Sequence, residues 1–379
     1  MESVIKYLNL FAKNCRFSVK FHQTKDVNDL ANVIFNVSPF AKTVIFSKEI
    51  KNANLIKSIL NDFSQKGLKP IFYFIKDNLN LSVENFAGAF NLPEDVRTVV
   101  ILDEKSIPLG QYFANFMRVP CFYYLTEELP RGVLSDKMLL RVGDKYDTVN
   151  LRLERHVLIK ENFNLEERTI LSLISGLSVL SDYTLNTVLG ITPNSERFYS
   201  IVKKSFINLS TVNNEDFVNT AVKCFFTLEF FNKALNSSPF IFSALEIFKI
   251  FYNDFIIGDE YFFAINKLLN KKIEQEFIPD YRKVAGEVCF KLNIGLLNAI
   301  DGIICQSKVF NGKIEQILPL IKGEFSCLTK LYNSLKKRVV GERNQKVDKS
   351  IYEKLFLTGS TPFGINAFSL VRELNFENL

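Results

Sequence analysis

Hydrophobic and polar positions alternate between two patterns over residues 1–160. Short apolar runs, typical of buried parallel strands, occur at Lys42–Ser47, Pro70–Ile75, Val99–Leu102 and Val119–Tyr124. Segments with helical apolar spacing lie among them, at Asn54–Gln65, Leu81–Phe90 and Gln111–Phe116. Parallel neighbours need crossover helices, so this order predicts a doubly wound, mostly parallel α/β sheet. Outer strands are expected at Phe17–Phe21 and Val149–Ile159.

The pattern changes after about Asn164. From there the apolar positions recur with helical spacing, and no strand pattern interrupts them. The expected helices are Leu165–Leu189, Ser195–Leu209, Glu215–Leu235, Phe240–Tyr252, Glu260–Leu269 and Asp280–Leu297. We therefore predict a Rossmann-like, nucleotide-binding type of α/β domain over residues 1–161 and an all-helical domain over residues 162–379.

Composition narrows the class of protein. The chain has 379 residues, 47% of them hydrophobic and 23% charged, which is enough to bury a large core. The net charge of +6 is mild, and the only dense basic cluster, which begins at Lys336, resembles a solvated helix end, so nucleic acid is not an expected partner. No apolar run reaches the roughly 18 residues of a membrane helix, so no membrane partner is expected.

The six cysteines are far apart and form no C-x-x-C pair. They are Cys15, Cys121, Cys224, Cys289, Cys305 and Cys327. Several lie in apolar runs, which favours reduced core residues and a cytoplasmic location.

The stretch from Val96 to Gly132, VRTVVILDEKSIPLGQYFANFMRVPCFYYLTEELPRG, predicts a strand, a turn, a helix and a second strand. Open α/β sheets bind nucleotides at such a turn. Three segments of the helical half also carry the resemblance, at Ser175–Val179, Ser237–Phe248 and Ile256–Asp259. Together with the order of elements, these stretches resemble the superfamily of glycerol-1-phosphate dehydrogenases, iron-containing alcohol dehydrogenases, polyol dehydrogenases and dehydroquinate synthases. The resemblance covers about residues 30–300, and it implies an NAD(P) cofactor and a dehydroquinate synthase-like fold.

The turn after the first strand departs from the family. Members carry three consecutive glycines there, and this sequence has Leu102, Asp103 and Glu104, with Gln111 at the position of a later lysine and Pro108 at that of an aspartate. Glycine lets backbone N–H groups approach the pyrophosphate closely, whereas two acidic side chains would repel it.

The resemblance places the cofactor-binding positions at Asp103, Glu104, Lys105 and Thr126. In the segment VPCFYYLT, Leu125 replaces the family's proline while Thr126 is kept, and Gly132 matches a family glycine. Lys48 fits either the extra phosphate of NADP or a solvated loop lysine.

The family also holds a divalent metal with one aspartate and two histidines of the helical domain, and this metal polarises the substrate oxygen. Val179, Glu246 and Ile257 occupy these positions, so no metal is expected. The chain's two histidines, His22 and His156, are in the α/β half, where we expect surface or strand-edge roles.

Two readings of the acidic and serine residues in the helical half remain open. Glu246, Asp259 and Glu260 suit either helix-surface charges or an oxygen-only site for Mg²⁺ or Ca²⁺. By the resemblance, Ser237, Ser238 and Glu246 would line a substrate cleft.

Two functional hypotheses follow. The first, which we favour, is a pseudoenzyme that acts as a scaffold or partner protein, in a homodimer or with an unidentified protein. The second is an NAD(P)H-dependent oxidoreductase that acts on a phosphorylated polyol or a related small metabolite without the metal and uses Thr126, Ser237 and Ser238, with Glu246 as a further candidate. No catalytic residue is assigned. The turn at Leu102–Lys105 discriminates between them: an open anion pocket favours the second, and a pocket filled by Leu102 or Glu104 favours the first.

Overall fold

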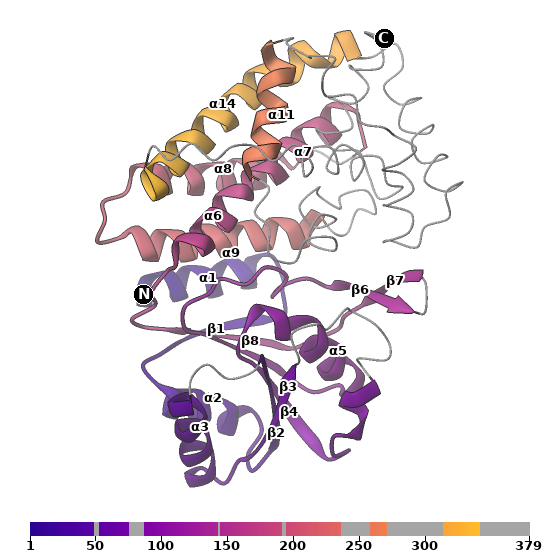
Figure 1. Cartoon of the computed structure of the whole chain (residues 1–379), viewed down its shortest axis with the longest axis vertical. Coiled ribbons are helices and arrows are strands. Elements are labelled where there is room, and N and C mark those ends of the chain that lie inside the picture. The colour runs from indigo at the N-terminus through magenta and orange to yellow at the C-terminus, as the bar shows by residue number, and fades with distance from the viewer. Residues whose placement is uncertain are drawn as a thin grey trace. The chain divides into compact units, whose positions relative to one another are not determined.

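The computed structural model of the chain describes residues 1–48, 53–75, 87–142, 145–191, 195–235, 258–270 and 314–341 (Figure 1). The chain divides into two compact units. The first comprises Met1–Thr169 and Asn213–Lys233, and the second comprises Ile170–Val212 and Ala234–Leu379.

A six-stranded parallel sheet forms the centre of the first unit, with the spatial order β1-β8-β5-β4-β2-β3. Its strands are β1 (Val19–Thr24), β2 (Lys42–Lys48), β3 (Lys69–Ile75), β4 (Val96–Ile101), β5 (Cys121–Leu125) and β8 (Arg155–Lys160). The predicted doubly wound sheet is confirmed. The outer position predicted for Val149–Ile159 is wrong, because β8 lies between β1 and β5. Five of the six β8 residues are buried, as an inner strand requires.

One face of the sheet is covered by α2 (Val27–Val37) and α3 (Ala53–Gln65). The buried positions of α2 recur with helical spacing, and they pack on a core that includes Ile45, Val100 and Phe122 of the sheet. Helix α3 ends before Gly67, whose φ of +73° is typical of the glycine that follows a helix.

The other face is covered by α1 (Glu2–Asn14), α5 (Ile107–Met117) and most of α9 (Phe217–Leu235). Phe21 of β1 meets Phe226 of α9 at 4.9 Å between ring centroids, and Phe11 of α1 meets Phe230 at 5.1 Å, so α1 and α9 lie side by side (Figure 1). Gly110 lets α5 approach the sheet, because a Cβ there would lie 2.7 Å from the side chain of Ile101.

A hairpin of β6 (Lys137–Val142) and β7 (Lys145–Asn150), which the sequence analysis did not predict, precedes β8. Arg155 ties its base to the sheet. The Arg155 guanidinium, 1% exposed, donates to Asp136 at 3.1 Å, and Nζ of Lys233 donates to the same oxygen at 2.7 Å. Burial, followed by the nearby charge of Arg155, lowers the pKa of Lys233. One carboxylate thus holds two buried cations together.

The second unit is helical in the part that the structure describes. It holds most of α6 (Glu167–Ser175), together with α7 (Leu177–Val188), α8 (Glu196–Thr211), α11 (Gly258–Asn270) and α14 (Ile314–Val340). Helix α14 packs against α7, α8 and α11, and its Glu324 pairs with Lys203 of α8 at 2.7 Å.

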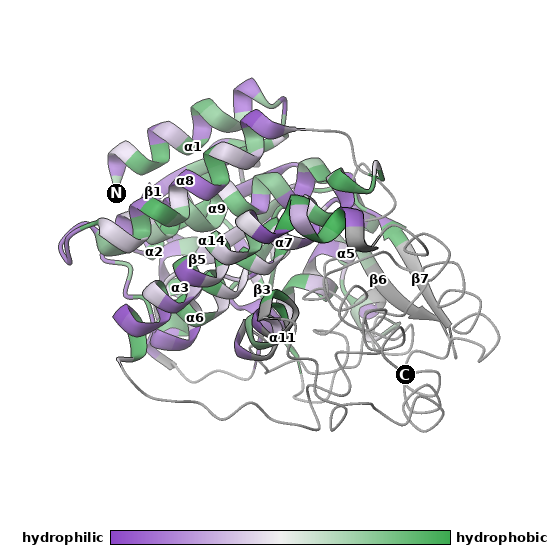
Figure 2. Cartoon of the chain, turned by 90° about the horizontal axis from the view of Figure 1, so that it is seen from above, coloured by the Kyte–Doolittle hydropathy of each residue, from purple (hydrophilic) through white to green (hydrophobic). Residues whose placement is uncertain are grey.

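Beyond β8, the described residues contain no strand, so the predicted α/β-then-helical fold class is confirmed. The predicted helices at Phe240–Tyr252 and Asp280–Leu297 lie outside the described residues. The described helices carry both hydrophobic and hydrophilic positions (Figure 2). Among them, none combines the length and the apolarity that crossing a bilayer requires.

The structure describes four of the cysteines, and two of these four have the expected position in the core. Cys121 and Cys224 are buried, Cys15 is half-buried and Cys327 is exposed, and none of these four is in a disulfide. Cys289 and Cys305 lie outside the described residues.

Candidate functional site

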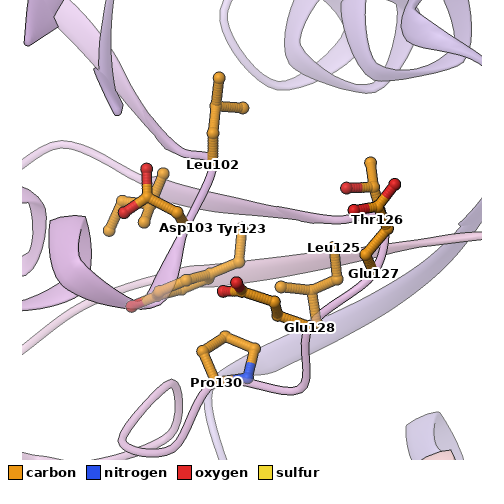
Figure 3. A pocket seen from close by; sticks show the side chains of 9 residues that line it. Leu102, Asp103, Tyr123, Leu125, Thr126, Glu127, Glu128 and Pro130 are labelled. Atoms are coloured by element: carbon orange, nitrogen blue, oxygen red, sulfur yellow. The ribbon is translucent and has the colours of Figure 1, made fainter. Parts of the chain in front are cut away.

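A pocket of about 150 Å³ opens where β4 and β5 end (Figure 3). It is lined by Ile101, Leu102, Asp103, Tyr123, Leu125, Thr126, Glu127, Glu128 and Pro130. The two strands are parallel neighbours, so their carboxyl ends meet at one edge of the sheet. The pocket is therefore in the place where the sequence analysis expected a cofactor.

Asp103 closes the turn after β4 with its own side chain. Its Oδ1 accepts hydrogen bonds from the backbone N–H of Ser106 at 3.0 Å and from the Ser106 hydroxyl at 2.8 Å. Its Oδ2 accepts from the backbone N–H of Lys48 at 2.6 Å and from the hydroxyl of Ser47 at 3.2 Å. Asp103 is thus the N-cap of the short helix η2 (Glu104–Ser106), and it joins that helix to the end of β2.

In this arrangement, a side chain of the turn itself occupies backbone hydrogen-bond donors at the turn. Backbone N–H groups at a helix N-terminus that follows a parallel strand are well placed to bind phosphate. Here the N–H groups of Ser106 and Lys48 already bind a carboxylate that belongs to the chain itself.

The side chain at the turn's donors is that of Asp103, whereas the alternatives considered from the sequence were an open anion pocket or one filled by Leu102 or Glu104. The N–H of Leu102 donates to the carbonyl of Phe46 at 3.1 Å, and its side chain packs against the core under α2 and α3. Figure 3 shows the side chain of Leu102 pointing away from that of Asp103. Glu104 is exposed.

The rim of the pocket is acidic. Glu127 and Glu128 follow β5 and keep access to solvent (Figure 3). Partial desolvation at the pocket wall raises the pKa of Glu128, and the negative charge of Glu104 raises it further, with smaller additions from Asp103 and Glu166. The carboxylates around the pocket thus repel one another, and they would also repel an anionic ligand that entered it.

A buried hydrogen-bond network supports the back of the pocket. Nε2 of Gln111, on α5, donates to the hydroxyl of Tyr123 at 2.9 Å and to the carbonyl of Gly132 at 2.9 Å. The N–H of Gly132 donates to Glu229 of α9 at 3.0 Å. Gly132 has a φ of +82°, which explains the need for glycine at this position. Gln111, which stands at the position of the family's lysine, therefore uses its side-chain N–H donors to hold the loop after β5 to the sheet.

The four predicted cofactor-binding residues divide into two pairs. Asp103 and Thr126 line the pocket, whereas Glu104 and Lys105 are exposed on the turn. Lys48 ends β2, where its backbone N–H binds Asp103. A ligand-binding role for any of these residues stays a prediction.

In the helical unit, the structure describes one of the three positions that correspond to the family's metal ligands. Val179, on α7, is 2% exposed and belongs to the apolar core. Glu246 and Ile257, like the predicted cleft residues Ser237 and Ser238, lie outside the described residues.

The acidic side chains near these positions have protein partners. Asp182 of α7 is 1% exposed and accepts a hydrogen bond from the hydroxyl of Tyr261 at 2.6 Å. Asp259 of α11 accepts two hydrogen bonds from Nζ of Lys336, at 2.7 and 2.8 Å, and one from Tyr332 at 2.8 Å. A carboxylate already bound by an ammonium group is a poor ligand for Mg²⁺ or Ca²⁺, so the oxygen-only reading of Asp259 loses support.

The two histidines lie together in the sheet and bind each other. Nε2 of His22, on β1, is 3.1 Å from Nδ1 of His156, on β8, and the His156 ring stacks on Phe122 at 4.6 Å between centroids. Burial lowers the pKa of His22 to about 4, with smaller contributions from His156 and Lys20. The predicted surface or strand-edge role holds for His22, since β1 is an edge strand, but it is wrong for His156, which is 1% exposed on an inner strand.

The residues at the ligand positions do not fit the divalent metal that the dehydrogenase superfamily named in the sequence analysis holds with one aspartate and two histidines. Both histidines belong to the α/β unit, and one of the three ligand positions is a buried valine. Within the described ranges, no three histidine, cysteine, aspartate or glutamate side chains are grouped as metal ligands.

Comparisons with known proteins identify similar folds among solved structures. No family model and no curated protein matches the sequence. Among solved structures, the protein YQHD of E. coli K-12 matches with a TM-score of 0.56 at 11% identity, over 95% of this chain and 96% of that chain.

Two structures from Thermotoga maritima match similarly. An iron-containing alcohol dehydrogenase aligns with a TM-score of 0.52 at 12% identity, over 96% of this chain and 98% of that one. The NADH-dependent butanol dehydrogenase A aligns with a TM-score of 0.51 at 12% identity, over 95% and 96%. The chain therefore has the fold of the iron-containing alcohol dehydrogenases.

Proposed function

We propose that this protein is a catalytically degenerate relative of the metal- and NAD(P)-dependent polyol and alcohol dehydrogenases, and that it acts as a scaffold or partner protein. One observation carries the proposal. The carboxylate of Asp103 binds the backbone N–H of Ser106 in the short helix after β4 and that of Lys48 at the end of β2, at the edge of the sheet where a dinucleotide phosphate would need such donors.

Electrostatics support the same conclusion. A pyrophosphate placed at this turn would compete with Asp103 for the N–H groups and would face Glu128 across the pocket. Two like charges about 4 Å apart repel by roughly 4 kcal/mol at an effective dielectric constant of about 20. That repulsion is about half of the binding free energy of a micromolar ligand.

The donor chemistry supports the loss of the metal. In hydride transfer, a divalent ion supplies the Lewis acid that polarises the substrate oxygen. Val179 has no lone pair with which to bind such an ion, and both histidines are bonded to each other in the other unit. We therefore derive no catalytic step through a metal.

A thermal melt with millimolar NADH and NADPH tests the proposal, and the Thermotoga maritima NADH-dependent butanol dehydrogenase serves as the positive control. A ligand at about a hundred times its dissociation constant adds roughly 2.7 kcal/mol of stability, which moves the midpoint visibly. We expect the midpoint of the control enzyme to rise and that of this protein to stay unchanged. A clear rise for this protein would contradict the proposal and favour an NAD(P)H-dependent oxidoreductase that works without the usual metal.

A further inference from the structure

A second, larger hollow lies at the opposite end of the same strands, where β5 and β8 begin. Its volume is about 770 Å³. One wall is the end of α5 with the link to β5, and the other is the link from β7 to β8. We call it the amino-end groove, and it is lined by Asn115, Phe116, Arg118, Val119, Pro120, Asn150, Arg152 and Glu154.

Arg118 is held at the rim of this groove by its backbone. It ends α5 in the left-handed conformation, with a φ of 55° and a ψ of 42°. Its N–H donates to the carbonyl of Asn115, and the next N–H, of Val119, donates to that of Ala114 at 3.0 Å. Glycine usually takes this position because it has no side chain to strain. An arginine here projects its guanidinium from a fixed point.

Arg152 is fixed from the opposite wall. Its backbone N–H donates to Oδ1 of Asn115 at 2.7 Å, which joins the two walls of the groove. Both arginines are exposed, and in the part of the chain that the structure describes neither guanidinium makes a hydrogen bond or an ion pair. Within the described ranges, the groove therefore presents two guanidinium groups that no carboxylate pairs with.

Among the described residues that line the groove, the one acidic side chain is already paired. Glu154 accepts from Nζ of Lys20 at 3.3 Å, and it lies 3.3 Å from Nε2 of His156. It therefore does not neutralise Arg118 or Arg152. Phe116, 58% exposed, adds apolar surface beside the two charges.

We propose that the amino-end groove binds an acidic, extended segment of a protein partner, whose carboxylates pair with Arg118 and Arg152 while an apolar side chain packs on Phe116. Guanidinium groups bind carboxylates bidentately, which gives direction as well as charge. The open form of the groove favours a chain segment, because small-molecule sites bury most of their ligand. This inference rests on the proposed function, a scaffold or partner protein, because it specifies the chemistry of the protein that such a scaffold would bind.

The test is fluorescence anisotropy at low salt with a fluorescein-labelled peptide of glutamates around one leucine. The double variant Arg118→Ala with Arg152→Ala should bind about a hundredfold more weakly, at roughly tenfold for each charge-assisted pair. Phe116→Ala should weaken binding less.

The matched control is the double variant Arg16→Ala with Arg97→Ala. It removes the same two charges from exposed positions outside the groove, and Arg16 also ends a helix with a positive φ, of 57°. It should bind the peptide within about twofold of the unchanged protein, because distant surface charges are largely screened. Circular dichroism of each variant checks that the fold is kept.

Three results would overturn the inference: no binding by the unchanged protein, equal weakening in the control variant, or equal affinity for an oligothymidylate of the same charge, which would indicate a nucleic-acid surface instead. The NADH melt is independent of all three. A midpoint shift with intact peptide binding would overturn only the proposed function, and lost peptide binding without a midpoint shift would overturn only this inference.

Discussion

The two ends of the central sheet differ in charge and in how that charge is used. At the carboxyl end, the side chain of Asp103 takes up the backbone donors, and Glu127 and Glu128 make the rim acidic. At the amino end, Arg118 and Arg152 line a groove that is about five times larger, and their guanidinium groups are unpaired within the described residues. In doubly wound sheets the carboxyl end is the usual place for an anionic ligand. Here the free positive charge is at the opposite end.

The comparison teaches that a fold fixes where donors are, but not whether they are available. The helix after β4 still presents its N–H groups at the edge of the sheet. The carboxylate of Asp103 binds one of them, that of Ser106, together with the N–H of Lys48 in β2, so the position that binds phosphate in such folds stabilises the protein instead.

The largest expected effect is on the network behind the acidic pocket. Gln111→Leu should lower the free energy of unfolding by about 1–3 kcal/mol, because the buried hydroxyl of Tyr123 and the carbonyl of Gly132 each lose a donor. Urea denaturation measures this loss. Gln65→Leu, at an exposed position of α3, is the control and should change stability by less than about 0.5 kcal/mol. Equal effects would show that the network does not support the carboxyl end.

The next effect concerns Asp103 itself. Asp103→Ala should cost about 1–2 kcal/mol, the usual range for a lost N-cap, because Ser106 and Lys48 lose their acceptor. Asp103→Asn keeps one acceptor oxygen, so it should cost less. Chemical denaturation of both variants measures the difference. If Asp103→Ala is as stable as the unchanged protein, the carboxylate is not an internal substitute for a ligand, and the comparison between the two ends fails.

A third effect is a pH dependence at the histidine pair. The pKa of His22 is lowered from 6.5 to about 4 in the folded protein, so the unfolded chain takes up the proton first as the pH falls. Stability from this group is present above about pH 6.5 and is lost as the pH falls towards 4. His22→Gln is neutral throughout, so the difference in stability between the two proteins should shrink or reverse over this range.

Denaturation series at several pH values measure that difference. His156, Glu154 and Lys20 are unchanged in the variant, so subtraction removes most of their contribution. Parallel curves for the two proteins would show that His22 titrates in the folded state as it does in the unfolded chain.

The sheet could be predicted because each strand is a short apolar run bounded by polar residues. Runs such as Lys42–Ser47 and Val119–Tyr124 match β2 and β5 to within a few residues. The position of β8 could not be predicted in this way, because the apolar pattern spans both β7 and β8 and does not indicate which neighbour a strand will pair with. The placement of α9 on the sheet, through Phe226 and Phe230, depends on contacts between residues about 200 apart in the chain.

A pocket lies at the turn that the sequence pattern indicated, but its hydrogen bonds were not predicted, and its role as a binding site stays a prediction. The sequence located Asp103 and Thr126 at the pocket, from the strand and turn pattern around them. Asp103 was interpreted as a cofactor-binding position whose charge repels phosphate, and not as a helix cap. A readable signal for its capping role was present, since an aspartate at the start of a helix commonly binds the N–H two or three residues later, where Ser106 stands. Its bond to Lys48 joins separate strands, and nothing in the local sequence indicates it.

The most direct test of the central claim is a titration of NADH into the purified protein, followed by the fluorescence of the nicotinamide. Since Asp103 already binds the donors that the pyrophosphate would need, we expect no saturable change up to millimolar NADH, both for the unchanged protein and for Arg118→Ala with Arg152→Ala. Saturable binding by the unchanged protein that survives the arginine substitutions would contradict the account, because the dinucleotide would then bind despite Asp103.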